Sequence, residues 1–391
     1  MIERSQRSLF WMLGAGSALA AYGIYKLVWH YVSHGQCHRM DKVVDGVLGA
    51  IGNTPLIRIA SLSEATGCEI LGKAEFLNPG GSVKDRVAKE LVEEGMKSGA
   101  LDIGGLITEG TVGSTGVSLV MVAKAVGCRC HIVMPDDAAI EKAQTLEALD
   151  AVVERVRPVS IVHPDHFVNV ARRRANEESK NGPHGAMFAD QFENLANFRA
   201  HLKTGAEMWS QTNGKMDAFV SGAGTGGTIA GVSNYLKGKS ERVKIFLSDP
   251  PGSSLYNKVT RGVMYDSVEA EGKRLRNPFD TITEGVGINR TTQNFSLAKI
   301  DGAFKCSDRE AVEMSKHLVR NDGLFLGSST AVNCVGAVKV AKSLGPGHVI
   351  VTILCDGGAR HLSKFHNPEY LEGAGLAPRG EGGSLDFIQM D

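Results

Sequence analysis

The sequence has little that would support a disulfide framework, a zinc site or a nucleic-acid-binding surface. Its seven cysteines are odd in number and contain no Cys-x-x-Cys pair, which favours free thiols in a reducing compartment. Its 43 basic and 43 acidic residues balance, so we expect no nucleic-acid partner, and we expect no metal. A chain of 391 residues is long enough for two hydrophobic cores.

Lys84 is the most informative residue in the chain. It follows a Pro-Gly-Gly turn in the run from Asn78 to Arg86, near the start of a helix predicted at Ser82–Ser98. The positive end of a helix dipole disfavours an ammonium and favours the neutral, nucleophilic amine that a Schiff base needs. A surface lysine at a helix end is the alternative interpretation of this run taken alone.

A second run, from Ser221 to Thr228, is rich in glycine and lies between a predicted strand, Met216–Val220, and a predicted helix, Ile229–Leu236. Such a turn directs backbone N–H groups at an anion, and threonine hydroxyls can add further donors. No Gly-Lys-Ser/Thr follows, which excludes a Walker loop, and a tight hairpin is the alternative. A Schiff-base lysine together with a phosphate-binding turn indicates pyridoxal 5′-phosphate as the cofactor.

Four short motifs occur in the order that is typical of one enzyme family: Ile51–Leu56, Asn78–Arg86, Gln191–Asn194 and Gly224–Thr228. Together they resemble the cysteine synthase (O-acetylserine sulfhydrylase) and cystathionine β-synthase family of fold-type II pyridoxal-phosphate enzymes, over residues 41–370. The resemblance implies a two-lobed α/β fold, similar to the tryptophan synthase β chain, in which helices cover both faces of parallel sheets. It also implies a homodimer.

The resemblance further implies roles for individual residues, with Lys84 as the attachment point of the cofactor and the base for the α-proton. Contacts with the cofactor are implied for Lys84, Ser114, Gly224, Thr225, Gly226, Gly227, Thr228, Gly285 and Ser328, with Ser329 as the alternative to Ser328 at the pyridine nitrogen. Contacts with the substrate are implied for Thr111, Val112, Gly113, Thr115 and Gln191. A neutral serine at the ring nitrogen leaves the ring a weaker electron sink, which suits β-elimination better than transamination.

Two positions depart from the family pattern in the substrate loop. Val112 stands where the family has serine, and Ser114 stands where the family has the asparagine that contacts the ring hydroxyl of the cofactor. We expect the cofactor to bind in spite of both changes.

The implied function is a transferase reaction, β-replacement that makes L-cysteine from O-acetylserine and sulfide. Cystathionine β-synthase-like and serine or threonine dehydratase activities are the enzymatic alternatives. We expect no tandem regulatory domain after Tyr370, which favours the simpler synthase. A membrane-tethered, cofactor-binding scaffold or sensor with little synthase activity is the alternative of another class, and the changes at Val112 and Ser114 motivate it.

Alternating apolar runs and amphipathic segments predict strands that alternate with helices, as in parallel sheets. Strands are predicted at Glu69–Phe76, Leu106–Glu109, Cys128–Met134, Ala151–Val156, Met216–Val220, Val243–Leu247 and His348–Leu354. Helices are predicted at Ser82–Ser98, Ser114–Val126, Ala139–Leu149, Ile229–Leu236, Asp308–Asn321 and Ala331–Ser343.

The N-terminal segment predicts a membrane anchor at Leu9–Val32, because Leu9–Tyr25 carries no charge and Lys26 can extend toward the interface. A cleaved secretory signal and a matrix presequence are alternatives. The segment resembles mitochondrial outer-membrane anchors, as in membrane-anchored fungal mitochondrial members of the family. That location places the catalytic lobes in the cytosol, with another membrane or the mitochondrial interior as alternatives.

The predicted domain organisation has four parts. Residues 1–40 form the anchor and stem, and residues 41–190 form an N-terminal lobe whose first strands can cross to the other lobe. Residues 191–370 form a C-terminal lobe with the phosphate-binding turn, and residues 371–391 form a disordered tail that is rich in glycine.

Overall fold

A computed structural model describes residues 43–138, 140–266, 281–379 and 384–390. The predicted anchor at Leu9–Val32 lies outside the described residues. Within the described ranges, no helix combines the length and the apolar character that crossing a membrane requires. The described residues from Asp45 onward form one compact unit, and every element discussed below belongs to it.

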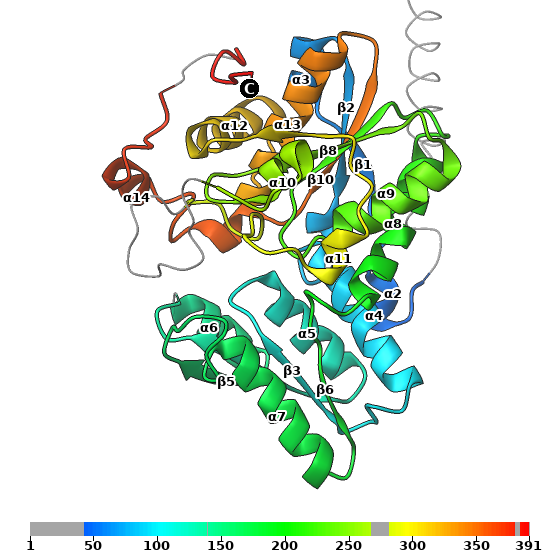
Figure 1. Ribbon diagram of the computed structural model, residues 1–391, viewed down its shortest axis with the longest axis vertical. Helices are drawn as coiled ribbons and strands as arrows, with labels where there is room; N and C mark the ends of the chain where they lie inside the picture. Colours follow the sequence, from blue (N-terminus) through cyan, green and yellow to red (C-terminus); the bar gives the residue numbers. More distant parts are fainter. Residues whose placement is uncertain (1–42, 139, 267–280, 380–383, 391) are drawn as a thin grey trace, which may run out of the picture. The chain divides into compact units, whose positions relative to one another are not determined.

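Two sheets form the framework of this unit (Figure 1). All of their strand pairs are parallel except the antiparallel pair of the first two strands. The larger sheet has the order β1 (Leu56–Arg58), β2 (Glu69–Ala74), β10 (Val349–Leu354), β7 (Ala218–Ser221), β8 (Lys244–Asp249) and β9 (Gly302–Lys305). The smaller sheet has the order β5 (Val152–Val156), β4 (Arg129–Pro135), β3 (Leu106–Gly110) and β6 (Ala186–Phe188).

Two strands in the middle of the sheets, β3 and β7, are buried along their whole length. Every residue of β3 and every residue of β7 is buried, without the alternation of a strand that has one wet face. Parallel strands show this pattern when helices cover both faces of the sheet. The prediction of an α/β fold with covered parallel sheets is therefore confirmed.

Helices connect the strands and cover the sheets (Figure 1). The helices from the first half of the chain are α2 (Gly46–Ala50), α3 (Ala60–Thr66), α4 (Lys84–Lys97), α5 (Ser114–Ala125), α6 (Ile140–Ala148), α7 (Phe167–Asn181) and α8 (Ala196–Gln211). Those from the second half are α9 (Gly227–Lys239), α10 (Leu255–Arg261), α11 (Gln293–Ser296), α12 (Asp308–Asp322), α13 (Ser328–Leu344) and α14 (Pro368–Gly373), with short 3₁₀ turns at Glu75–Leu77 and Gly358–His361.

The first two strands pair outside the lobe that follows them in the sequence, an arrangement that the predicted domain organisation left open. Strand β2 pairs with β10 over its full length, from Glu69 opposite Val349 to Ala74 opposite Leu354. The strands β1 and β2 therefore belong to the sheet of the second lobe, although they precede the first lobe in the sequence. The N-terminal lobe proper begins with α4, the helix that carries Lys84.

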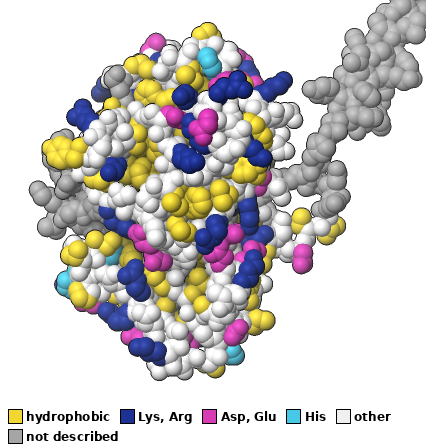
Figure 2. Space-filling model, turned by 45° about the vertical axis from the view of Figure 1, so that its right-hand side comes forward, with side chains coloured by type: hydrophobic (Ala, Val, Ile, Leu, Met, Phe, Trp, Pro, Cys, Tyr) yellow, Lys and Arg dark blue, Asp and Glu magenta, His cyan; other side chains and the backbone are white. Residues whose placement is uncertain are grey.

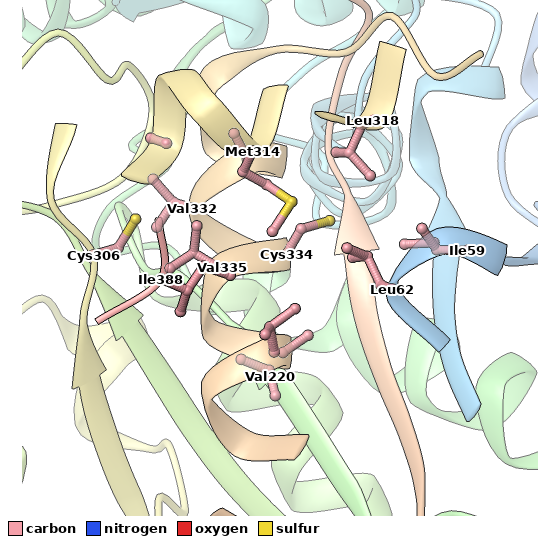
Figure 3. Close-up of a cluster of buried hydrophobic side chains, with 14 of the residues drawn as sticks. Ile59, Leu62, Val220, Cys306, Met314, Leu318, Val332, Cys334, Val335 and Ile388 are labelled. Atoms are coloured by element: carbon pink, nitrogen blue, oxygen red, sulfur yellow. The ribbon is translucent and has the colours of Figure 1, made fainter. Parts of the chain in front are cut away.

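The last residues of the chain are packed, which corrects the prediction of a disordered tail. Leu385 and Ile388 are 7% and 5% exposed and join the largest cluster of buried hydrophobic side chains. Figure 3 shows Ile388 beside Val335 on α13 in this cluster. A glycine-rich composition suggested disorder, but Phe387 also packs against this cluster and Gln389 N–H donates to Glu310 Oε1 at 3.0 Å, so residues 384–390 are held on the core.

The predicted elements are present with small shifts at their ends. Strand β2 ends earlier than predicted because Glu75 turns inward to Arg86, whose Nε lies 2.7 Å from Glu75 Oε2. Helix α13 begins before the predicted Ala331, at Ser328. No bounds were predicted for the short elements β1, β6, β9, α2, α3, α10, α11 and α14, nor for the long helices α7 and α8.

A buried network of charges joins α4 to β2 and α8. Glu207 on α8 accepts hydrogen bonds from Arg86 Nη1 and Nη2, both at 2.7 Å, and lies 2.6 Å from Lys73 Nζ. Arg86 also pairs with Glu75, and the side chains of Lys73 and Glu75 are fully buried. The network therefore fixes the helix that begins with Lys84 against two other elements.

The charged side chains on the surface are exposed to solvent, unlike those of the buried network. Lys, Arg, Asp and Glu side chains are interspersed over the face shown in Figure 2. The pair of Arg129 with Glu178 is an example, with side chains 55% and 27% exposed. Such exposed pairs contribute about 0–1 kcal/mol to stability.

Candidate active site

A cavity of about 950 Å³ lies where several parallel strands end. Its lining includes Thr111 after β3, Gln191 after β6, Gly222 after β7 and Asp356 after β10. The carboxyl ends of parallel strands are the usual place for a ligand in such sheets. The cavity is lined by every predicted site residue except Gly227 and Ser328.

Lys84 lines this cavity as the first residue of α4. The Pro-Gly-Gly turn before it is held by the end of β10, because Val83 N–H donates to the carbonyl of Cys355 at 2.9 Å. Burial lowers the pKa of the Lys84 amine below its ordinary value, while the charges at Cys355 and Asp356 act in the opposite direction. Burial thus shifts the amine toward the nucleophilic form, a cause that the sequence pattern did not suggest.

The turn after β7 forms a cup at the start of α9. Gly226 has a φ of +84°, and a Cβ there would lie 2.5 Å from Phe295 Cβ. A Cβ on Gly224 would lie 2.4 Å from the carbonyl oxygen of Gly285. Bare backbone therefore lines the cup, and the first N–H groups of a 13-residue helix have no side-chain cap at Gly226.

Two side chains behind the cup orient its hydroxyls, and neither was predicted. Asn197 on α8 donates to Thr225 Oγ1 at 2.9 Å, which leaves the Thr225 proton for an acceptor in the cavity. His201 Nε2 lies 3.2 Å from Thr228 Oγ1. Burial, together with the charges of Arg86 and Lys84, lowers the pKa of His201 well below its ordinary value. The cup therefore offers hydroxyl and backbone donors beside a neutral imidazole.

The substrate loop begins at the end of β3 and opens α5. Residues 112 and 113 of this loop are exposed and line the cavity, and Val112 is 37% exposed. Thr115 Oγ1 donates to Gln191 Oε1 at 2.7 Å, so the two predicted carboxylate contacts lie side by side. Glu109 lies below them, 3.5 Å from Gln191 Nε2, and burial raises the pKa of Glu109 to about 8.

Ser329, and not the predicted Ser328, lines the cavity at the start of α13. Ser328 is fully buried, and its Oγ accepts a hydrogen bond from the N–H of Glu284 at 2.9 Å. Successive residues of a helix point in directions about 100° apart, and here Ser329 faces the cavity while Ser328 faces Glu284. The sequence could not decide this register because both neighbours are serines.

These observations fit pyridoxal 5′-phosphate. The cup from Gly222 to Thr228 offers N–H and O–H donors and contains no carboxylate, as a phosphate dianion requires. The Lys84 amine lies in the same cavity with a lowered pKa, as a Schiff-base lysine requires. Gly285, at the rim of the cup, has a φ of +80° and leaves room beside it, since no atom lies within 4 Å of its Cβ position.

Asp356 and His361 belong to the cavity although no sequence pattern indicated them. Asp356 follows β10, and its Oδ2 lies 3.0 Å from His361 Nε2 and 3.4 Å from Ser114 Oγ. Isolated acidic and histidine residues in a C-terminal loop carry no motif, so only their position beside Ser114 distinguishes them.

The fold and the cavity define a pyridoxal-phosphate-dependent enzyme of the two-lobed α/β type, and the chain belongs to that family. Residues 47–356 match the family described as "Pyridoxal-phosphate dependent enzyme". The cofactor is pyridoxal 5′-phosphate.

Within the family, this chain is most usefully compared with cysteine synthases. It is 51% identical to cysteine synthase 2 of Schizosaccharomyces pombe over 388 residues, which cover 96% of this chain and 98% of that protein. It is 49% identical to a Saccharomyces cerevisiae protein named "Putative mitochondrial cysteine synthase", with 89% and 88% covered. An O-acetylserine-dependent cystathionine β-synthase structure from Helicobacter pylori is similar, with a TM-score of 0.69 at 30% identity, covering 83% of this chain and 98% of that one.

Proposed function

We propose that this protein is a cysteine synthase, which makes L-cysteine from O-acetylserine and sulfide. In this β-replacement the C–O bond to acetate breaks and a C–S bond forms at the β-carbon, so that L-cysteine and acetate leave. The observation that carries the proposal is the meeting of three parts in one cavity: the Lys84 amine, the phosphate cup and the carboxylate-binding loop. The identity to cysteine synthases over nearly the whole chain supports it.

The substrate loop would bind the α-carboxylate of the amino acid. The N–H groups at the start of α5 point from a 12-residue helix whose N-cap, Gly113, has no side chain to cap them. Thr115 and Gln191 lie beside them and hold each other through their hydrogen bond. Val112 stands where the family has serine, so the loop lacks that hydroxyl but keeps its backbone donor.

Lys84 would then move the α-proton. Bound pyridoxal phosphate supplies a ring that withdraws electrons from the α-carbon. The lowered pKa of the Lys84 amine favours the neutral form, which can accept a proton. Ser329 is proposed at the ring nitrogen, where a neutral hydroxyl matches elimination chemistry.

A two-substrate comparison tests the function. Purified protein loaded with pyridoxal phosphate should form cysteine from O-acetylserine and sulfide with a kcat/KM that exceeds cystathionine formation from serine and homocysteine by at least about tenfold, or about 1.4 kcal/mol. Both products are measured by chromatography under the same conditions.

The other possible results of this comparison distinguish between the alternative functions. Faster cystathionine formation would support the second enzymatic candidate, which the similarity to an O-acetylserine-dependent cystathionine β-synthase keeps open. Pyruvate or 2-oxobutyrate from serine or threonine alone would support a dehydratase. If no product forms from any of these substrates, the result would support a role as a scaffold or sensor, which the changes at Val112 and Ser114 motivate.

We also propose that the protein is a homodimer attached to the mitochondrial outer membrane by Leu9–Val32, with its catalytic residues in the cytosol. The support is the uncharged apolar run in the sequence and the name of the Saccharomyces cerevisiae relative, which refers to mitochondria. The dimer rests on the family resemblance.

Extraction at alkaline pH tests the anchor. The full chain should remain in the membrane pellet in carbonate, while a form that begins at Asp41 should be released, because only the first carries the apolar run. Equal release of both forms would show that Leu9–Val32 does not anchor the protein.

A glycosylation site reports which side of the membrane the lobes occupy. Of the two Asn-x-Ser/Thr sequences, Asn294 is fully buried, and its side chain donates to the carbonyl of Phe192 at 2.7 Å, so it is a poor acceptor in the folded protein. Asn289 is half-buried and is the useful reporter. A glycan on Asn289 would place the lobes in the secretory lumen and contradict the proposed location.

A further inference from the structure

Asp356 sits where three parts of the cavity wall meet. Its side chain is 11% exposed and contacts the buried ring of His361, and its Oδ2 also faces the Ser114 hydroxyl at the start of α5. The backbone of Asp356 also forms an isolated antiparallel β-bridge with Ser82, two residues before Lys84. Its second oxygen, Oδ1, has no hydrogen-bond partner among the described residues.

The direction of the hydrogen bonds follows from the chemistry of the groups. A carboxylate only accepts, so Ser114 must give its single proton to Asp356, and His361 must carry a proton on Nε2. Ser114 then has only lone pairs left to present to the cavity. An asparagine at this position would present an N–H donor instead.

The start of α13 holds the pair in this arrangement. A Cβ on Gly327 would lie 2.1 Å from Asp356 Oδ1 and 2.4 Å from His361 Nε2, so no larger residue fits there without moving the pair. The N–H of Gly327 also donates to the backbone carbonyl of Asp356 at 3.0 Å. The backbone of Asp356 is therefore tied to the start of α13, and the glycine there leaves the space that the pair occupies.

We propose that Asp356, oriented by His361, is a positioning residue that turns the Ser114 hydroxyl away from the cofactor and makes position 114 a hydrogen-bond acceptor. The inference rests on the proposed contact of Ser114 with the ring hydroxyl of pyridoxal phosphate. An acceptor at this point stabilises a ring hydroxyl that keeps its proton, whereas a donor stabilises the ring oxyanion. The three residues together thus set the protonation of the cofactor ring in the resting enzyme.

The experiment is a visible absorbance spectrum of the holoenzyme without substrate. Asp356→Asn replaces the acceptor by an amide that can donate to Ser114 Oγ, so the serine proton can turn to the ring. The ratio of the long-wavelength to the short-wavelength cofactor band should then rise about two- to tenfold, the effect of one hydrogen bond. His361→Phe should change the ratio in the same direction by a smaller factor, because Asp356 loses its orienting partner.

A double-mutant cycle isolates the role of Ser114. In a Ser114→Ala background, Asp356→Asn should leave the band ratio unchanged, since no serine proton remains to be redirected. His366→Phe is the matched control, because His366 is also buried and hydrogen-bonded, to the carbonyl of Leu326 at 2.8 Å, but does not line the cavity. The control should keep the wild-type spectrum.

Two results would overturn the proposal. A band ratio that changes equally with and without Ser114 would mean that Asp356 acts on Lys84 or the cofactor directly. An unchanged ratio in both Asp356→Asn and His361→Phe would mean that the pair has no role at the ring. If Asp356→Asn does not retain cofactor, His361→Phe decides alone. Because no substrate is used, failure of the cysteine synthase assay leaves this result standing.

Discussion

The Lys84→Ala variant should lose catalysis and the visible absorbance of the bound cofactor together. Lys84 is the residue we propose for both covalent attachment and α-proton transfer, and it lines the cavity with a pKa lowered by burial. A positioned acid–base group alone contributes about 10²–10⁴-fold to a rate, so loss of attachment as well should reduce turnover by at least about 10⁴-fold. The measurement is steady-state cysteine formation with a spectrum of the dialysed protein.

Lys142 provides the matched control for this experiment. It lines the same cavity but pairs with Glu284, whose Oε2 lies 3.0 Å from Lys142 Nζ. Lys142→Ala should keep the visible absorbance. If instead Lys84→Ala retains absorbance after borohydride treatment and dialysis, the attachment point is another lysine and the assignment of Lys84 is wrong.

The Glu207→Gln variant should lose about 3–5 kcal/mol of stability. Removing the Glu207 charge from this buried network leaves the Lys73 ammonium without a carboxylate and leaves Arg86 with Glu75 alone. The midpoint of denaturant unfolding at neutral pH measures the effect. Glu178→Gln, in the exposed pair with Arg129, should cost only about 0–1 kcal/mol. Equal midpoints for the two variants would contradict a structural role of the network.

The stability difference between wild type and Glu207→Gln should depend on pH in a predictable way. Burial alone would raise the pKa of Glu207, but the hydrogen bonds and charges of Arg86 and Lys73 outweigh it and lower the pKa from 4.5 to about 2. A carboxyl whose folded pKa lies below its unfolded value contributes its full stability above the unfolded pKa and loses it as the pH falls. The stability difference between wild type and Glu207→Gln should therefore shrink as the pH falls from 4.5 toward 2.

Much of the site follows from local sequence patterns. The Pro-Gly-Gly turn before Lys84 and the glycine-rich turn before α9 are short segments whose backbone geometry is determined by nearby residues. For the same reason the predicted bounds of β3, α5 and α12 lie within a few residues of the observed ones. Short elements such as β6 and β9 carry too few residues to show a period, so the sequence could not reveal them.

The sequence by itself determined the chemistry that is available: a lysine at a helix start, a glycine-rich turn with donors that suit a phosphate, and a loop that opens a helix. Tertiary structure decided which of these groups face one cavity. Ser329, and not Ser328, lines the cavity. Strand β2 pairs with β10, which lies near the other end of the chain. The same folding places Asp356 and His361 beside Ser114. These outcomes depend on contacts between residues far apart in sequence, because burial and sheet pairing, and not local propensity, determine which side chains meet.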